Sequence, residues 1–225
     1  MQAGASWTIL VDIHGGQPGQ IVGMITYPSI DCGGTLELGV SDAGVGDAGD
    51  AGASTITLHE SVSASCITEG EDTFTLLPDG GLAYEYRVTP EGPVGAWGTL
   101  TRLGERGVVS STFGGVWHAG APNENNLRTL MLSVSRDDAV GAPSGVFLLD
   151  RDGSSGCAGY WTLASTSPGT LRFTEVFEHG QTGCDGPGTT LLEKVAADVA
   201  FSRTIDGGVA FDAGADGGGL KLTRF

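Results

Sequence analysis

Lysine and long apolar runs are what this sequence most clearly lacks. Its 225 residues include 11 Lys and Arg against 27 Asp and Glu, so the formal net charge is −16, and its only lysines are Lys194 and Lys221. A nucleic-acid backbone or an anionic membrane surface would repel such a chain. No apolar run approaches the roughly 20 residues that span a bilayer. We therefore predict no nucleic-acid binding and no membrane span, and we take the charge to serve solubility or, as the alternative, a cationic partner.

The signatures of common catalytic and metal sites are also missing. The sequence has no Gly-x-Ser-x-Gly elbow, no His-Glu-x-x-His pair, no phosphate-binding loop and no Cys-x-x-Cys spacing. The aspartates of Asp150-Arg-Asp-Gly153 suit a turn and lack the ordered ligand series of an EF-hand. We predict no catalytic residue, no cofactor and no metal site.

Cysteine is scarce, but its placement is informative. The four cysteines fall two to each half of the chain, as Cys32 with Cys66 and Cys157 with Cys184. We predict one disulfide within each half, which indicates an oxidising, extracytoplasmic location. The start, Met1-Gln-Ala-Gly, shows no charged and apolar signal segment. The sequence therefore does not show how the chain would reach that location.

The order of motifs repeats once along the chain. A period of roughly 110 residues is too long for a solenoid and matches the size of a small domain. We predict two tandem modules, over residues 1–105 and 106–225. The repeated motifs, first copy and then second, are Cys32-Gly-Gly-Thr-Leu-Glu-Leu, Thr55-Ile-Thr-Leu-His-Glu60, Cys66 and Gly98-Thr-Leu-Thr-Arg102, and then Cys157-Ala-Gly-Tyr-Trp-Thr-Leu, Thr170-Leu-Arg-Phe-Thr-Glu175, Cys184 and Gly219-Leu-Lys-Leu-Thr-Arg224.

Short alternating segments separated by Gly, Pro and Asp turns predict an all-β chain. Closure removes exposed sheet edges, so we predict two antiparallel β-barrels rather than open sandwiches. The nearest helix candidate is Leu191–Ala200. Aligning Gly23 with Gly145 leaves Val116–Gly120 without a counterpart in the first copy. The first barrel is therefore expected to lack a strand, or to borrow one from Val108–Phe113.

Alternation also places charged residues on apolar faces. Glu60 shares a face with Ile56 and Leu58, and Glu175 shares one with Leu171 and Phe173. In the last strand of each copy, the apolar face carries Arg102 and Arg224. Because a buried charge is costly without a partner, we predict the ion pairs Glu60–Arg102 and Glu175–Arg224. They are expected to seal the core or, alternatively, to line a ligand pocket.

A resemblance adds to this interpretation. The stretch from Gly15-Gly-Gln-Pro-Gly19 through Tyr27-Pro-Ser-Ile-Asp-Cys32, with Glu60 and Gly98-Thr-Leu-Thr-Arg102, resembles a small secreted domain of bacterial surface lipoproteins and of the outer portions of actinobacterial serine/threonine kinases. That resemblance covers most of the first copy and implies an extracytoplasmic location without an established chemistry. By weaker analogy, an early Trp117 and a late Arg224 are similar to the pattern of calycins, the lipocalin- and avidin-like barrels.

Taken together, these features predict a non-catalytic extracytoplasmic binding or surface-interaction protein. Its partner is expected to be a protein, a glycan or a small apolar ligand, and its oligomeric state is open. A secreted protease inhibitor is the first alternative, and a secreted hydrolase the second.

Overall fold

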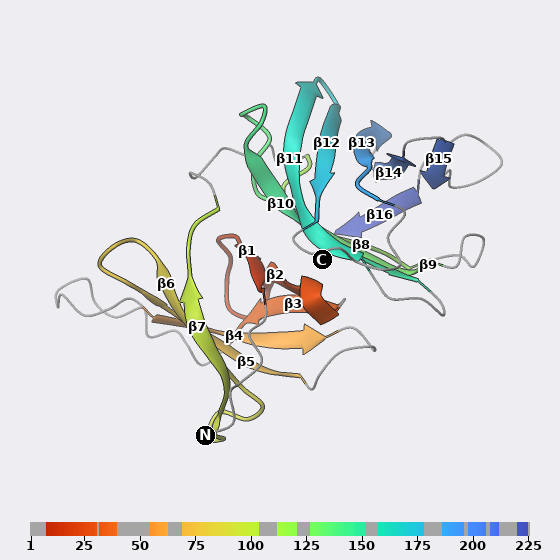
Figure 1. Cartoon of the computed structure of the whole chain (residues 1–225). Coiled ribbons are helices and arrows are strands. Elements are labelled where there is room, and N and C mark those ends of the chain that lie inside the picture. The colour runs from red at the N-terminus through yellow and green to blue at the C-terminus, as the bar shows by residue number, and fades with distance from the viewer. Residues whose placement is uncertain are drawn as a thin grey trace.

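The chain folds into two antiparallel β-sheets. The computed structural model describes residues 8–30, 32–39, 55–62, 69–103, 112–120, 127–151, 157–177, 186–195, 198–205, 208–211 and 220–224. Apart from one 3-10 turn, η1 (Pro28–Ile30), the regular elements in these ranges are strands. None of the described residues forms a helix long and apolar enough to cross a membrane. The two sheets lie side by side, one at the lower left and one at the upper right of Figure 1.

The first sheet is a simple meander that curls without closing. Seven strands pair in chain order, each antiparallel to the next. No described strand pairs with the outer edge of the first or the last of them, and we call this sheet the half-barrel. Its strands are β1 (Leu10–Ile13), β2 (Ile21–Tyr27), β3 (Cys32–Leu38), β4 (Thr55–Val62), β5 (Gly70–Leu76), β6 (Leu82–Arg87) and β7 (Val94–Leu100).

The second sheet closes into a barrel of eight strands, which we call the closed barrel. Closure depends on two contacts, the pairing of β13 with β14 and the position of β8 between β16 and β9. The short β15 pairs with the part of β14 that β16 does not reach. Its strands are β8 (Gly115–Gly120), β9 (Leu127–Val134), β10 (Pro143–Arg151), β11 (Cys157–Ser167), β12 (Thr170–Val176), β13 (Thr189–Val195), β14 (Asp198–Ile205), β15 (Gly208–Phe211) and β16 (Leu220–Arg224).

The all-β class is confirmed, but the prediction of two closed barrels is wrong for the first copy. The reason is the strand that the alignment left without a counterpart, since β8 closes the second sheet and no described strand takes its place in the first. The alternative of a strand borrowed from Val108–Phe113 is not supported by Phe113, which packs in the core of the closed barrel. Residues 108–111, like the expected boundary at 105/106, lie outside the described residues.

The helix candidate Leu191–Ala200 is also wrong. Strand β13 runs to Val195, and β14 begins at Asp198 and pairs back along β13. Alternate side chains of this hairpin, such as Leu192 and Phe201, are buried in the barrel. Burial of this period-two pattern overrides the helix propensity of the intervening residues.

The registers of the two sheets define equivalent positions. Gly23 pairs with Leu36 as Gly145 pairs with Trp161, and the ladders continue in step from these pairs. The equivalent positions used below, with the half-barrel residue first, are Val11 and Leu132, Leu82 and Val199, Ala96 and Phe211, Gly98 and Leu220, Leu100 and Leu222, Glu60 and Glu175, Asp72 and Thr190, and Tyr86 and Arg203.

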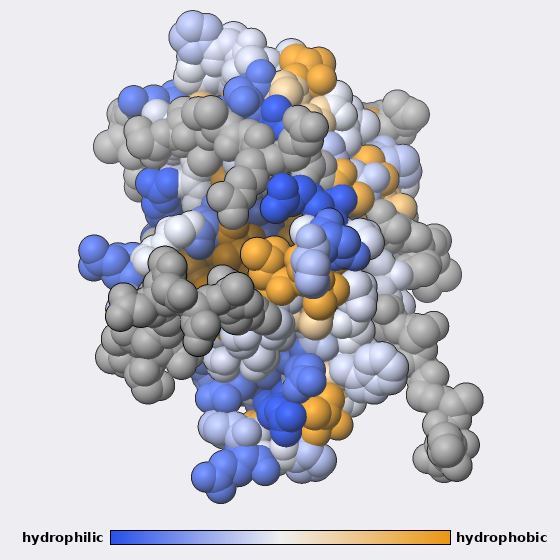
Figure 2. Space-filling model, turned by 90° about the vertical axis from the view of Figure 1, so that its left-hand side faces the viewer, coloured by the Kyte–Doolittle hydropathy of each residue, from blue (hydrophilic) through white to orange (hydrophobic). Residues whose placement is uncertain are grey.

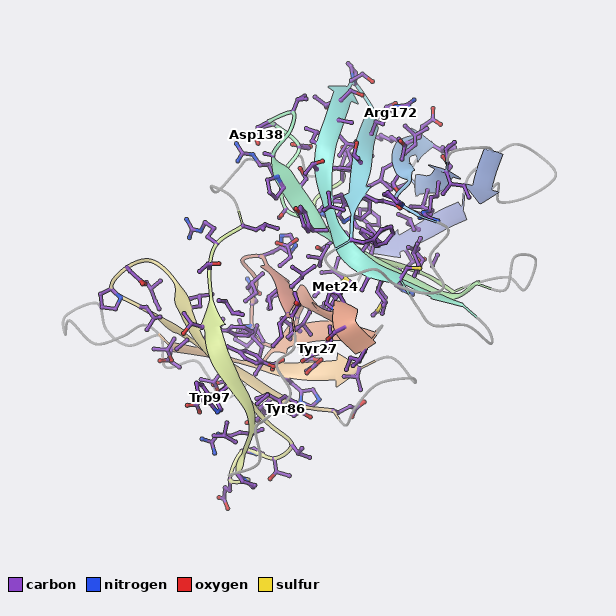
Figure 3. The ribbon with its side chains drawn as sticks, viewed as in Figure 1. Met24, Tyr27, Tyr86, Trp97, Asp138 and Arg172 are labelled. Carbon is purple, nitrogen blue, oxygen red and sulfur yellow. The ribbon has the colours of Figure 1, made fainter. Side chains whose placement is uncertain are left out.

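Each sheet has its own interior core, and a third cluster joins the two sheets. In this cluster Met24, on the outer face of β2, is fully buried against the outer faces of β8–β11. Figure 3 labels Met24 where the two sheets meet. A polar contact reinforces the junction, because the Ser133 hydroxyl donates to the Asp12 carboxylate at 2.6 Å. The closed barrel therefore serves as a support on which one wall of the half-barrel rests.

Candidate functional site

A fully buried ion pair joins Glu175 on β12 to Arg203 on β14 inside the closed barrel. The Arg203 Nε atom lies 2.8 Å and 2.9 Å from the two Glu175 oxygens, and Nη2 lies 2.7 Å from Oε2. The Thr190 hydroxyl and the Gly188 amide also donate to this carboxylate, each at 2.9 Å. The Arg203 and Glu175 side chains are 0% and 1% exposed. Such charge-assisted bonds compensate both charges for the loss of water.

The inward orientation of Glu175 and Glu60 is confirmed, but both predicted partners are wrong. Arg203 takes the place expected for Arg224, whose exposed side chain lies with its guanidinium carbon 5.1 Å from the centre of the Trp117 ring. Arg102 is exposed just beyond the end of β7. The reason is position along the strand, since Arg102 and Arg224 fall at barrel ends where water reaches them. Trp117 and Arg224, the pair behind the calycin analogy, are in contact.

We predict that Arg203→Ala lowers the free energy of unfolding by about 3–5 kcal/mol, because it leaves the Glu175 carboxylate buried without a cation. Arg172→Ala is the matched control, since Arg172 is an exposed residue of β12 in the same barrel (Figure 3). The control should change stability by no more than about 0.5 kcal/mol. Denaturant unfolding measures both, and equal losses for the two variants would contradict the assignment.

In the half-barrel, the position equivalent to this ion pair holds a different group of side chains. Glu60 is equivalent to Glu175, but Asp72 replaces Thr190 and Tyr86 replaces Arg203. Glu60 and Asp72 are both 0% exposed. The Tyr27 hydroxyl donates to Glu60 Oε2 at 2.9 Å, and the Tyr27 and Tyr84 hydroxyl oxygens lie 3.4 Å apart. Two carboxyl groups are thus buried together among tyrosines.

The electrostatics of this acidic cluster, Glu60 with Asp72, are unusual. Burial raises the pKa of Glu60 to about 8, with repulsion from Asp72 adding to the rise and the Tyr27 hydrogen bond opposing it. Burial also raises the pKa of Asp72 to about 7, while Tyr84 and Glu60 lie near enough to lower it in part. Neither Asp72 oxygen, nor Glu60 Oε1, has a hydrogen-bond partner of good geometry among the described residues. The cluster therefore holds protons that ordinary carboxyl groups would release near pH 4.

A glycine faces the glutamate in both sheets. Gly70 pairs with Glu60, and the Glu175 amide donates to the carbonyl of Gly188. A Cβ atom on Gly70 would lie 2.5 Å from the Tyr86 ring, and one on Gly188 would lie 3.1 Å from Glu175 Oε2. The carbonyl oxygens of Arg87 and Thr204 would lie 2.5 Å and 2.8 Å from the same added Cβ atoms, so glycine is needed because the neighbouring strand as well as the interior side chain takes up the space.

A raised carboxyl pKa means that the folded chain binds protons more tightly than the unfolded chain. We therefore predict that the free energy of unfolding falls as pH rises from about 4 through about 8. Asp72→Asn removes one titrating group and its repulsion on Glu60, so it should flatten this fall. Denaturant unfolding across the pH range measures the effect. Glu193→Gln, at an exposed residue of β13, is the control and should keep the wild-type dependence of stability on pH. A wild-type stability that rises over this pH range would contradict the assignment.

A serine, a histidine and an aspartate also meet at the junction between the sheets. Asp12 lies between the other two, since its Oδ2 atom accepts from the Ser133 hydroxyl at 2.6 Å and lies 3.5 Å from His14 Nε2. The Ser133 hydroxyl in turn accepts from the Val146 amide at 3.1 Å. Ser133 is fully buried, so a substrate would not reach its hydroxyl. In a catalytic triad the histidine would contact the serine, and here the aspartate does.

The clearest difference between the two sheets lies along the unclosed side of the half-barrel. The inward residues Val11 on β1, Leu82 on β6 and Leu100 on β7 are only partly buried. Their closed-barrel equivalents, Leu132, Val199 and Leu222, are 0%, 3% and 2% exposed. In Figure 2, which is drawn from the side on which the half-barrel lies in Figure 1, apolar side chains are exposed near the centre of the face. We call the side of the half-barrel on which Val11, Leu82 and Leu100 are partly exposed the open side.

Strand β7 borders the open side and carries small inward residues. Ala96 and Gly98 stand where the closed barrel has Phe211 and Leu220. A Cβ atom on Gly98 would meet no described atom within 4 Å, although Gly98 faces the interior beside the buried Tyr84. On the outer face of the same strand, Trp97, which is labelled in Figure 3, is 82% exposed. In the described part of the chain, the border of the open side thus combines small inward residues with an exposed aromatic ring.

The remaining sequence predictions concern the cysteines and metal binding. Cys32 and Cys157 are buried and neither is a free thiol, but Cys66 and Cys184 lie outside the described residues, so the pairing stays a prediction. In the part of the chain described, no three His, Cys, Asp or Glu side chains are grouped to hold a metal. A shallow recess in the closed barrel is lined by Ser167, Gly169 and neighbouring residues, at the other end of β12 from Glu175.

The interior residues missed from the sequence include Arg203 and Asp72. Arg203 alternates with Val199 and Phe201, so the rule that found Glu175 would also have found it. Asp72 alternates with Phe74 in the same way. The signal was therefore present, but the motif order shared by the two copies favoured the terminal arginines instead.

Comparison with protein-family models, with curated proteins and with solved structures gives no match for this chain.

Proposed function

We propose that this chain is a non-catalytic binding protein, in which the half-barrel holds the ligand and the closed barrel supports it. The observation that carries the proposal is the contrast along the open side. Equivalent inward residues are fully buried in one sheet and partly exposed in the other. Keeping apolar side chains exposed costs stability, so a large exposed apolar surface usually marks a binding site.

Among the described residues, side chains pack the interior of the closed barrel. Trp161 packs edge-on against Phe147 and Phe173, with ring centres 5.6 Å and 4.8 Å apart. These rings and the surrounding Leu and Val side chains are almost fully buried. A barrel of eight strands can be filled by side chains or can hold one small ligand, and the packed rings here correspond to the first case. This supports a scaffold role for the closed barrel and a binding role for the half-barrel.

We also propose that the protein acts outside the cytoplasm. The support is the matching placement of its cysteines in the two copies, together with burial of Cys32 and Cys157 without a free thiol. The resemblances to secreted bacterial surface domains and to calycins belong to this proposal as well. Protease inhibition and hydrolysis are the alternative functions, and no contact described above favours either.

A neutral apolar dye such as Nile red tests the binding role. We expect the wild-type protein to bind it, and Gly98→Leu to weaken binding on the order of tenfold or more, because leucine would fill the space beside β7. The matched control is Thr99→Leu, which adds the same side chain at an exposed position on the same strand. Fluorescence titration measures all three proteins.

Absence of dye binding by the wild-type protein would contradict the proposal. So would a Gly98→Leu variant that binds the dye as tightly as Thr99→Leu does. Thermal unfolding of each variant checks that any loss of binding does not come from loss of the fold.

A further inference from the structure

Resting on the proposed function, we propose that the ligand of the half-barrel is an extended polypeptide segment of a partner, which pairs with β7 and completes the barrel as its eighth strand. The closed barrel supplies the template. There, β8 lies between β16 and β9, pairing with β16 at His118 and Trp117 and with β9 along its whole length. The half-barrel has strands equivalent to β16 and β9, namely β7 and β1, and no described strand between them.

The edge of β7 lacks the features that protect sheet edges from pairing. Exposed edge strands of soluble proteins usually carry lysine or other charges, proline, or a very short length. Strand β7 has seven residues, Val94-Gly-Ala-Trp-Gly-Thr-Leu100, with no charge and no proline. No described residue hydrogen-bonds along its outer edge. An unprotected edge of this length suits addition of a strand, in which backbone hydrogen bonds supply affinity.

The template also specifies the chemistry of the partner. An added strand that paired as β8 does would place its residue equivalent to Ala119 opposite Leu100. Its residue equivalent to Trp117 would lie beside Val11. Residues at these inward positions should be apolar, since they would cover the partly exposed Val11 and Leu82. The next inward position falls opposite Gly98, where space remains for a larger apolar side chain.

The net charge of the chain and the exposed ring of Trp97 further limit the chemistry of the partner segment. The chain carries a net charge of −16, so an acidic segment would be repelled and a neutral or basic one favoured. Trp97 projects from the outer face of β7, 82% exposed, beside the outward side chains of an added strand. Exposed Trp at an interface commonly contributes much of the binding energy, and its face attracts Lys or Arg. The inferred partner is therefore an extended, non-acidic segment with alternating apolar residues.

The first experiment adds an acetylated and amidated peptide with the sequence of Gly114–Ala121 to the ¹⁵N-labelled protein and follows backbone amide resonances. We expect the resonances of β1 and β7 to shift, with slowed exchange of the outward amides of β7. A peptide N-methylated at alternate residues, on the side that faces β7, is the control and should lose at least about tenfold in affinity, because it cannot donate to the ladder. Equal binding by both peptides, or no shift at β1 and β7, would overturn the strand assignment.

A second measurement guards against weak affinity of a short free peptide. Fusing the same eight residues ahead of Thr8 through a flexible linker makes pairing intramolecular, with an effective concentration in the millimolar range. The fused strand should raise the unfolding temperature and prevent Nile red binding, and a fusion with the same residues in scrambled order should do neither. If original and scrambled fusions behave alike, the inference fails.

These outcomes separate the inference from the proposed function. If the wild-type protein binds the dye at the open side but neither the peptide nor the fused strand affects β7, the binding role stands and strand addition is wrong. If neither dye nor strand binds, both proposals fail. Sedimentation without peptide tests whether a second copy of the chain occupies the β7 edge. A dimer whose β7 amides are already protected would assign the edge to that copy and would contradict the inferred partner segment.

Discussion

The structure depends on one constraint, which is that a curled β-sheet must either close on itself or leave an edge and part of its apolar interior uncovered. In the second sheet, β8 meets this constraint by pairing with both β16 and β9. In the first sheet, no described strand does so, and inward side chains such as Val11 and Leu100 remain partly exposed. The difference between a closed barrel and an open sheet thus comes from a single strand.

The uncovered sheet is held in shape by its neighbour. Strand β2 is buried on both faces, with Ile25 in the core of the half-barrel and Met24 against the closed barrel. This explains why Ile21–Tyr27 is an almost continuous apolar run, as strands covered on both faces usually are. A scaffold behind one wall allows the opposite side to stay open without collapse of the sheet.

Interior polar groups show how the two copies have diverged. Glu175 is compensated by Arg203, whereas Glu60 has Asp72 and tyrosines around it and retains its proton to a higher pH. Both solutions obey the same rule, since a buried charge must be paired or neutralised. Because the acidic cluster lies in the half-barrel, the stability of this sheet is coupled to pH through these two carboxyl groups.

Much of the fold, and less of the site, could be predicted from the sequence. Alternation of apolar residues gave the strands and the inward glutamates, because burial imposes that period directly. The missing strand was visible as an unmatched Val116–Gly120, yet its consequence, an open sheet, required knowing which strands β8 joins. The partner of Glu175 was missed because pairing between strands far apart in sequence is set by the sheet register, which alternation alone does not give.

Hydrogen–deuterium exchange of the free protein tests the central claim most directly, because amides at an unpaired edge exchange faster than amides in a closed ladder. The account predicts that part of the amides of β1 and β7 exchange much faster than those at equivalent positions of β9 and β16, while β3–β5 and β10–β12 are similarly protected. Equal protection of β7 and β16 would mean that the first sheet is covered at its edge, and would contradict the account.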